Sequence, residues 1–185
     1  MAKLETLTDD FTTLDTTIKW AILGGGPYVS GGTLHLGEDD YLEAQSDYEF
    51  TDSHLLLEIV RGNPAPTLYS ADFSTAIQFG LDGIGGIGVV DLLATEFLIH
   101  TGPLDPAALR WWKLRDESGT LILETSPDGS NWTSRGTAAN PLPSTVRMAL
   151  IQSGVGSDLS EVDNINLPTD IPPIPADTGR FFAFF

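Results

Sequence analysis

Apolar and polar residues alternate in short runs along almost the whole chain. In residues 146–152, for example, Val146, Met148 and Leu150 occupy every second position, and residues 54–61 follow the same period. A period of two places such residues on one face of a β-strand. No segment keeps a convincing 3.6-residue period for more than two turns. The pattern therefore predicts an all-β protein.

Glycine, proline, asparagine and aspartate separate these runs, as expected for turns between strands. The predicted strands cover residues 16–23, 32–36, 41–44, 54–61, 74–81, 88–100, 109–115, 120–125, 146–152 and 162–167. About ten short strands in one unit are typical of two antiparallel sheets packed as a jelly-roll sandwich. We expect this sandwich to span residues 1–167.

Residues 111–132, WWKLRDESGTLILETSPDGSNW, contain two alternating runs around the turn DESG. Alternation places Trp112 and Leu114 toward the core, whereas Trp111, Lys113 and Arg115 lie on the opposite face. A Trp on an outer face, beside long polar side chains, can stack on the apolar face of a sugar. If both faces of the sheet are covered, Trp111 is instead a buried packing residue. The candidate carbohydrate-binding residues are therefore Trp111, Lys113 and Arg115.

Residues 168–185 differ in composition from the rest of the chain. Their proline-rich part is expected to be extended and stiff, near polyproline II, and it cannot join a central strand. Four phenylalanines fill most of the last five positions: Phe181, Phe182, Phe184 and Phe185. Burying each ring stabilises by about 1.5–3 kcal/mol. We therefore expect this cluster to dock onto another chain; packing against its own sandwich is the alternative.

Acidic residues strongly outnumber basic ones. The chain has 26 Asp and Glu against nine Lys and Arg, a formal net charge of -17. Nucleic acids and anionic bilayers are bound mainly through Lys and Arg, so we expect neither as a partner. No apolar run is long enough to span a bilayer, and we see no secretion signal. The chain has no Cys, which excludes disulfides and thiolate chemistry.

Some of the carboxylates lie near the two ends of the predicted sandwich. Asp10 belongs to the acidic start of the chain, and Asp163 lies in the last predicted strand. If the first and last strands pair, these oxygen ligands converge, and hard ligands of this kind suit Ca²⁺. Asp10 and Asp163 are therefore the candidate metal ligands. The alternative is that they are solvated acids and turn caps.

Three segments resemble the concanavalin A-like lectin/glucanase superfamily. The hairpin RWWKLRDESGTLILETSPDGSNW is similar to one in which a strand turns into a second strand ending in S-x-D-G-x-x-W. DDFTTLDTTIKW is similar to the opening of such modules, and VRMALIQSG with EVDNIN to their closing strands. The resemblance covers residues 4–167. It implies a jelly roll of two curved antiparallel sheets that often binds carbohydrate on its concave face.

Hydrolases of that superfamily carry a catalytic E-x-D-x-x-E or similar run on one strand, with acid and nucleophile on one face. The nearest segment here is LEAQSDYEF, in which Glu43, Asp47 and Glu49 have a different spacing and Gln45 takes the middle position. We therefore expect a protein that is not an enzyme. A glycan hydrolase is the less favoured alternative.

The layout of the whole chain is similar to that of small tail or head-surface proteins of actinobacterial phages. It combines one lectin-like module, an acidic composition, no Cys and a short tail. This resemblance implies a non-catalytic virion protein, a minor tail or surface decoration protein, assembled in the host cytoplasm and oligomeric in the particle. The module would bind host surface polysaccharide, and the tail would bind other virion proteins. The alternative is a purely structural decoration protein that binds no sugar.

Overall fold

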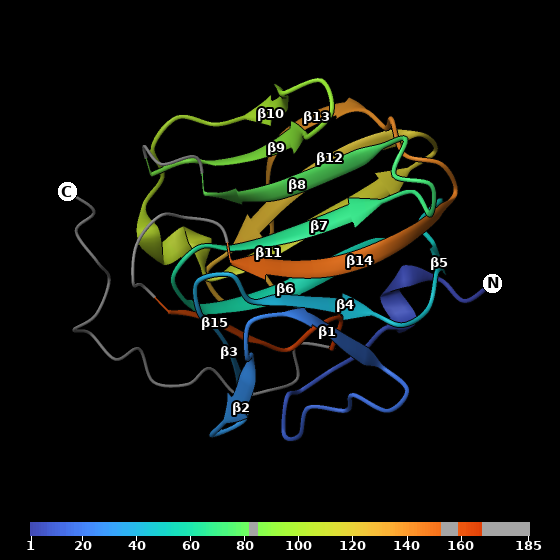
Figure 1. Ribbon diagram of the computed structural model, residues 1–185. Helices are drawn as coiled ribbons and strands as arrows, with labels where there is room; N and C mark the ends of the chain where they lie inside the picture. The colour runs from blue at the N-terminus through green and yellow to red at the C-terminus, as the bar shows by residue number, and fades with distance from the viewer. Residues whose placement is uncertain (82–84, 153–158, 168–185) are drawn as a thin grey trace.

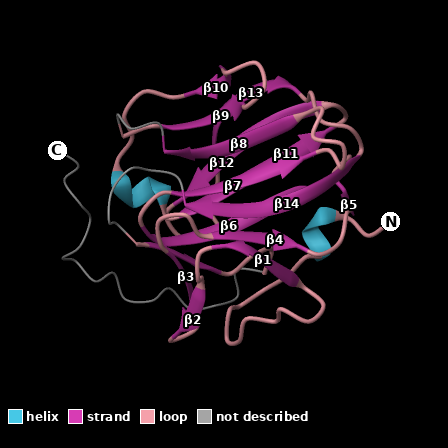
Figure 2. Cartoon of the chain, in the orientation of Figure 1, coloured by secondary structure: helices cyan, strands magenta, loops and turns pink. Residues whose placement is uncertain are grey.

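The computed structural model describes residues 1–81, 85–152 and 159–167, and the regular secondary structure of these residues is almost entirely β-strand (Figures 1 and 2). Two 3-10 helices accompany the strands, η1 (Leu4–Thr6) and η2 (Pro106–Leu109). Within this part of the chain, no helix has the length and hydropathy that crossing a membrane requires. The strands are β1 (Trp20–Gly24), β2 (Tyr28–Ser30), β3 (Thr33–Leu36), β4 (Tyr41–Ala44), β5 (Tyr48–Glu49), β6 (His54–Arg61), β7 (Pro64–Tyr69), β8 (Ala76–Leu81), β9 (Ile87–Asp91), β10 (Glu96–His100), β11 (Trp111–Glu117), β12 (Thr120–Ser126), β13 (Thr133–Ala139), β14 (Thr145–Gln152) and β15 (Ser160–Asp163).

The strands form two antiparallel sheets that stack as two layers (Figure 1). The eight-stranded sheet has the order β1-β4-β14-β7-β8-β9-β10, with β5 paired to β14. The seven-stranded sheet has the order β13-β12-β11-β6-β15-β3-β2. Strands far apart in the sequence, such as β4 and β14, are therefore neighbours. This arrangement confirms the predicted two-sheet jelly-roll sandwich.

The core lies between the two layers. Phe79 of β8 and Trp112 of β11 meet across it, with ring centroids 6.4 Å apart. Both side chains are fully buried, as is Leu114. The indole N–H of Trp112 donates to the carbonyl oxygen of Leu109 at 2.7 Å, so its polar atom is satisfied despite burial. The core positions predicted for Trp112 and Leu114 are confirmed.

The beginning of the chain pairs with the end of the sandwich. Asp9 and Ile165 exchange backbone hydrogen bonds of 3.0 and 2.8 Å. The Asp9 carboxylate accepts a hydrogen bond from the indole N–H of Trp20 at 2.7 Å. The amide of Asn166 donates to the carbonyl oxygen of Leu4 at 3.0 Å. The first and last strands themselves do not pair, because β1 pairs with β4 and β15 pairs with β3 and β6. The two ends of the sandwich meet instead through the bridge between Asp9 and Ile165.

Strand β7 was not predicted, because its segment contains two prolines. Pro64 and Pro66 pair with β14, but the register with β8 covers only Thr67 to Tyr69. The prolines therefore lie where β7 has a partner on one side, and there a missing N–H costs no ladder hydrogen bond. The prediction of one strand over residues 88–100 was also wrong. The Asp91 carboxylate accepts hydrogen bonds from the next loop and closes a turn that separates β9 from β10.

Candidate functional site

The outer face of the eight-stranded sheet carries the candidate site. In β14, Val146, Met148 and Leu150 point into the core, so Arg147 and Ala149 point outward. The same alternation turns the side chains of β4 and β7 outward at Tyr41, Glu43, Ala65, Thr67 and Tyr69. Three strands from separate parts of the sequence, β4, β7 and β14, therefore contribute to one surface.

One row of outward-facing residues crosses this sheet from edge to edge. From β1 to β10, the paired residues are Ala21, Glu43, Ala149, Thr67, Gln78, Val90 and Phe97. The centre of the row is small and uncharged, because Ala149 and Thr67 occupy it. The Gln78 amide donates to the Thr67 hydroxyl at 3.2 Å. The middle of the row is therefore made of small, buried, uncharged residues, with the polar Gln78 beside them.

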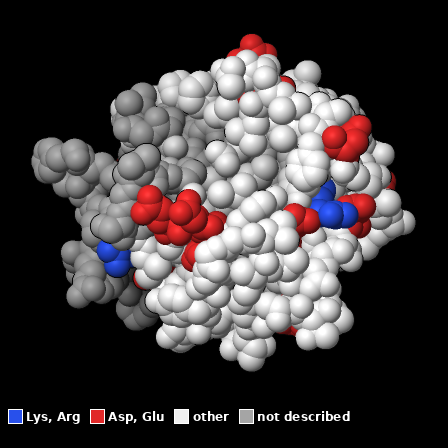
Figure 3. Space-filling model, in the orientation of Figure 1, with Lys and Arg blue, Asp and Glu red and all other residues white. Residues whose placement is uncertain are grey.

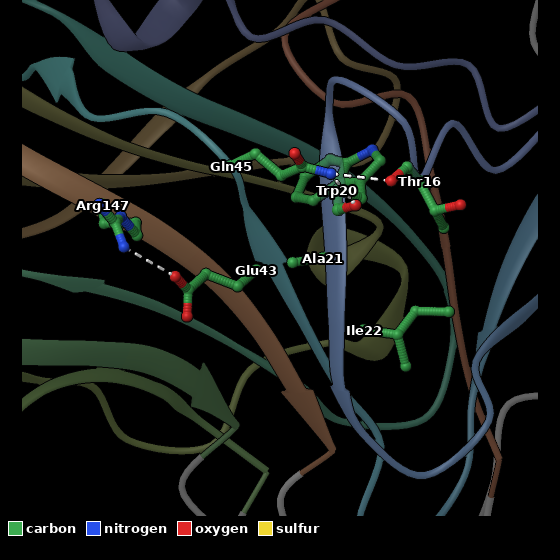
Figure 4. Close-up of a pocket in the computed structure, with 7 residues that line it drawn as sticks. All are labelled: Thr16, Trp20, Ala21, Ile22, Glu43, Gln45 and Arg147. Atoms are coloured by element: carbon green, nitrogen blue, oxygen red, sulfur yellow. Dashed lines mark hydrogen bonds and ion pairs between the residues drawn. The ribbon is translucent and has the colours of Figure 1, made fainter.

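Arg147 links two carboxylates at one side of this face, and Figure 4 shows its contact with one of them, Glu43. Its Nη1 lies 3.1 Å from Oε1 of Glu43, and its Nη2 lies 2.8 Å from Oδ1 of Asp47. Partial burial acts to lower the pKa of Arg147, but the bonds to Asp47 and Glu43 prevail and raise it. Glu43 is only 8% exposed. The nearly buried carboxylate of Glu43 is thus paired with a guanidinium that also binds the carboxylate of Asp47.

Two tyrosines lie beside Glu43. The Tyr41 hydroxyl is 3.5 Å from Oε2 of Glu43 and 3.5 Å from the Tyr69 hydroxyl. Burial, followed by the hydrogen bonds to Tyr41 and Glu43, raises the pKa of Tyr69 far above its usual range. Burial also raises the pKa of Tyr41. Both phenols therefore stay protonated near neutral pH and offer hydroxyl groups next to a carboxylate.

An open hollow of about 570 Å³ adjoins this group (Figure 4). It is lined by Thr16, Trp20, Ala21, Ile22, Glu43, Gln45 and Arg147. The Gln45 amide donates to the carbonyl oxygens of Thr16 and Trp20 at 2.8 and 2.6 Å. Gln45 therefore holds the preceding segment against β4 and shapes one wall of the hollow. Glu43 and Arg147 form the opposite, charged wall.

Charge is sparse on this side of a strongly acidic molecule. Figure 3, in the orientation that presents the eight-stranded sheet, shows Lys and Arg atoms in two small areas and a largely uncharged surface. Among the strands of this sheet, Arg147 is the only Lys or Arg. Uncharged polar and aromatic side chains therefore dominate what a ligand meets here.

The predicted carbohydrate platform lies on the opposite sheet and does not have the required exposure. Trp111 is 6% exposed, so its ring has almost no free face for a sugar. Lys113 pairs with Glu124 at 2.9 Å, and Arg115 pairs with Glu124 and Glu117 at 3.1 and 2.7 Å. The prediction of an exposed Trp111 platform was wrong, because this face of β11 is covered and Lys113 and Arg115 are engaged in ion pairs.

The two candidate calcium ligands are near each other but do not form a cation site. Asp10 is used locally, since its Oδ1 accepts two hydrogen bonds from Thr12 at 3.0 Å. Burial raises the pKa of Asp163 to about 6, with the charges of Glu58 and Asp10 adding to the effect. Over the described ranges, no group of three or more His, Cys, Asp or Glu residues is arranged to hold a metal ion. The residues present therefore do not fit Ca²⁺.

The predicted docking cluster, Phe181, Phe182, Phe184 and Phe185, lies outside the described residues, as does the proline-rich segment before it. These predictions stay untested.

Comparison with solved structures identifies the architecture. The β-glucanase of Bacillus licheniformis superposes with a TM-score of 0.63 at 9% identity, covering 85% of this chain and 95% of that one. The fold is that of the concanavalin A-like jelly roll. The exoplasmic/lumenal domain of VIP36, in a form bound to Ca²⁺ and Man3GlcNAc, gives 0.58 at 13% identity over 87% of this chain and 88% of that one. The κ-carrageenase of Pseudoalteromonas carrageenovora, in complex with an oligotetrasaccharide of κ-carrageenan, gives 0.59 at 13% identity over 88% and 93%.

No protein-family model matches the sequence, and no curated protein matches it. Identities of this size establish the fold alone. The expectation that the chain is not an enzyme is nevertheless wrong as a deduction, because the structures that share its concanavalin A-like fold include β-glucanases, a lichenase and a carrageenase. The spacing in LEAQSDYEF is therefore no ground for excluding catalysis.

The sequence contained a signal for Arg147 that the prediction did not use. Val146, Met148 and Leu150 were assigned to one face, which leaves Arg147 as a cation on the outer face of an otherwise uncharged strand. The pairing of Arg147 with Glu43 and Asp47 had no such signal. It joins segments about a hundred positions apart, and only the strand order brings them together.

Proposed function

We propose that this protein binds a polysaccharide along the outer face of its eight-stranded sheet. The observation that carries the proposal is the row from Glu43 to Phe97. Its centre, formed by Ala149 and Thr67, is small and uncharged, and a cluster of hydroxyl and ion-paired groups lies at one side. Saccharide sites combine apolar surface for the sugar faces with a few fixed polar groups for the hydroxyls. The κ-carrageenase and VIP36 structures, which share the fold, hold saccharides.

Each polar group has a defined part in this proposal. The Tyr41 hydroxyl, kept protonated, donates to or accepts from sugar hydroxyls, and the buried Tyr69 hydroxyl lies beside it as a hydrogen-bond partner. Glu43 and Asp47 accept hydrogen bonds from the sugar through the oxygen atoms that Arg147 does not occupy. Arg147 holds both carboxylates in place, so the site is ordered before the ligand arrives. Such ordering reduces the entropy lost on binding.

Hydrolysis of the bound glycan is the second candidate function. Glycosidases place two carboxyl groups roughly 5–9.5 Å apart, one as proton donor and the other as nucleophile or base. Glu43 and Asp47 are bound by the same guanidinium, and they are the two carboxyl groups of this face that would form such a pair. In this reaction, one of the two acids would protonate the glycosidic oxygen. The other would either attack the sugar carbon or activate a water molecule.

We further propose that the protein works in a phage virion, as a minor tail or surface decoration protein that recognises host surface polysaccharide. The layout of the chain and its Phe181 to Phe185 cluster support this proposal. Deleting residues 169–185 should leave the sandwich folded and abolish incorporation into particles. Incorporation of the shortened chain would contradict a docking role. Particles that need the protein but do not use it for host recognition would favour the purely structural alternative.

Affinity electrophoresis of the purified chain in gels containing single polysaccharides tests glycan binding. Arg147→Met should abolish retardation, because both carboxylates lose their anchor. Lys113→Met, on the opposite sheet, should leave retardation unchanged. Loss of binding in Lys113→Met alone would contradict the proposed face. Parallel gels should contain either EDTA or millimolar Ca²⁺. If binding were lost only in EDTA, it would depend on Ca²⁺.

The same samples separate binding from hydrolysis. New reducing ends, lost in both Glu43→Gln and Asp47→Asn, would establish catalysis by this pair. Binding without new reducing ends on any bound polysaccharide would exclude it.

A further inference from the structure

Phe73 is an exposed aromatic residue at the edge of the proposed site. It lies in the turn between β7 and β8 and is 61% exposed. Its ring rests on that of Tyr69, with centroids 4.7 Å apart and planes 11° apart. Tyr69 is paired in register with Arg147, on the outer face of the sheet. One face of the Phe73 ring is thus supported by Tyr69, and the other is open.

The turn is built to hold Phe73 in this position. The Ser70 hydroxyl accepts a hydrogen bond from the Thr75 N–H at 3.0 Å and donates to the Asp72 carboxylate at 2.7 Å. That carboxylate also accepts from the Ser74 N–H at 3.0 Å. Phe73 itself has φ of 55°, a left-handed conformation that bulky residues seldom adopt. Strained residues that the surroundings hold firmly cluster at ligand sites.

The charges around Phe73 restrict the chemistry of the ligand. Arg147, the one cation among the strands of this sheet, is already paired with Glu43 and Asp47. A sulfated or carboxylated sugar would find no free cation on these strands and would meet two carboxylates. A neutral sugar ring, by contrast, can place its apolar face on Phe73 and direct its hydroxyls toward Tyr41 and Gln78. Electrostatics therefore disfavours anionic glycans.

We propose that Phe73 is the stacking platform of the site and that the ligand is an uncharged glycan. This inference rests on the proposed function and adds the ligand class and a binding residue to it. A structural role for Phe73, as a cover for Tyr69, is the rival explanation. The test must therefore separate lost stacking from lost folding.

The chain offers a matched control. Tyr28 is 51% exposed and stacks on His35 with centroids 4.7 Å apart and planes 5° apart. It has almost the same geometry as Phe73, but it belongs to β2 of the other sheet. Tyr28→Ala removes an exposed stacked ring without touching the proposed site.

The experiment measures affinity for two sets of polysaccharides. The neutral set is barley β-1,3-1,4-glucan, laminarin and yeast mannan. The anionic set is κ-carrageenan, alginate and carboxymethylated laminarin. The full chain should bind a neutral member and bind the anionic set at least tenfold more weakly. Binding only to anionic members would overturn the inference while leaving the proposed function intact, whereas binding to neither set would contradict both.

Variants then test Phe73 on the polysaccharide that binds best. Phe73→Ala should weaken binding at least tenfold, Phe73→Tyr less than threefold, and Tyr28→Ala not at all. Phe73→Leu keeps an apolar cover on Tyr69 but has no flat face, so it should fold normally and still bind at least fivefold more weakly. If Phe73→Leu bound the polysaccharide as tightly as the wild type, the proposed stacking role of Phe73 would be contradicted.

Discussion

The guanidinium of Arg147 lies 3.1 Å from the carboxylate of Glu43, although the two residues are 104 positions apart in the chain. The contact exists because β4 and β14 are neighbours in the eight-stranded sheet. Glu43 is nearly buried, so its negative charge depends on this partner. The pair is therefore both a structural element of the sheet and the centre of the proposed site.

Arg147→Met should destabilise the protein by about 1–3 kcal/mol at pH 7, because Glu43 is left with a buried, unpaired charge. Urea denaturation at pH 7 measures this loss. The double variant Arg147→Met/Glu43→Gln should recover most of the stability, and a double variant no more stable than Arg147→Met would contradict the pairing.

Lys3→Met provides the control for this prediction. Lys3 pairs with Glu49 at 3.1 Å, and both side chains are more than one-third exposed. Exposed ion pairs contribute about 0–1 kcal/mol, so this change should have only a small effect on stability.

Trp111→Ala should lower the free energy of unfolding by about 3–5 kcal/mol, as the loss of a buried indole does elsewhere. Glycan binding by the folded fraction should not change, because Trp111 lies on the seven-stranded sheet. Thermal unfolding and affinity electrophoresis of the same sample check the two halves of this prediction. If Trp111→Ala were as stable as the wild type but bound glycan more weakly, Trp111 would be a binding residue and this prediction would be contradicted.

Asn166→Ala should cost about 2–4 kcal/mol, because it leaves several buried backbone groups without a partner. The Asn166 side chain accepts from the Leu56 N–H at 2.7 Å and donates to the carbonyl oxygens of Leu4 and Leu7 at 3.0 Å. Hydrogen exchange should accelerate most around η1, whose chain segment this side chain holds. Asn131→Ala, in an exposed turn, should change stability little. If Asn131→Ala and Asn166→Ala destabilised the protein equally, the proposed role of the Asn166 hydrogen bonds would be contradicted.

Asp163→Asn should stabilise the protein at pH 8 and have little effect at pH 4. Burial raises the pKa of Asp163 from 3.8 to about 6, so the folded state holds its proton more tightly than the unfolded state does. Stability is therefore lost as the pH rises from about 4 to 6, and Asn removes that loss. The Asp163 side chain is partly exposed, so we expect a gain of about 1 kcal/mol after allowing for solvent screening.

Melting temperatures at pH 4, 6 and 8 test this sign. Millimolar Ca²⁺ should not alter the difference between Asp163→Asn and the wild type. A Ca²⁺-dependent rise in melting temperature of the wild type alone would show that Asp163 is a metal ligand after all.

Much of the fold follows from period-two patterns, and its exceptions have physical causes. Strands β4 and β6 have the predicted bounds, because each has alternating residues and clear flanking turns. Strand β13 was missed because it is an edge strand with few apolar positions, and edge strands bury little. Strand β7 was missed because proline usually argues against a strand. Here Pro64 and Pro66 are tolerated, since β8 does not pair with this part of β7.

The candidate site was less predictable than the fold. Its polar groups, Tyr41, Tyr69 and Arg147, lie on three strands whose order the sequence does not state. Trp111, at the start of the hairpin that suggested a sugar platform, is buried on the opposite sheet. The tryptophans clustered in the hairpin sequence include packing residues. The candidate site, by contrast, consists of common residue types that the strand order brings together.

The most direct test of the account is the footprint of a glycan on the ¹⁵N-labelled chain. An oligosaccharide of the best-binding polysaccharide, titrated while amide chemical shifts are recorded, should move signals of Glu43, Thr67, Phe73, Gln78 and Arg147. Signals around Lys113 and Glu124 should stay in place. The reverse pattern, with shifts on β11 and β12 and none on β4, β7 and β14, would contradict the proposed binding face.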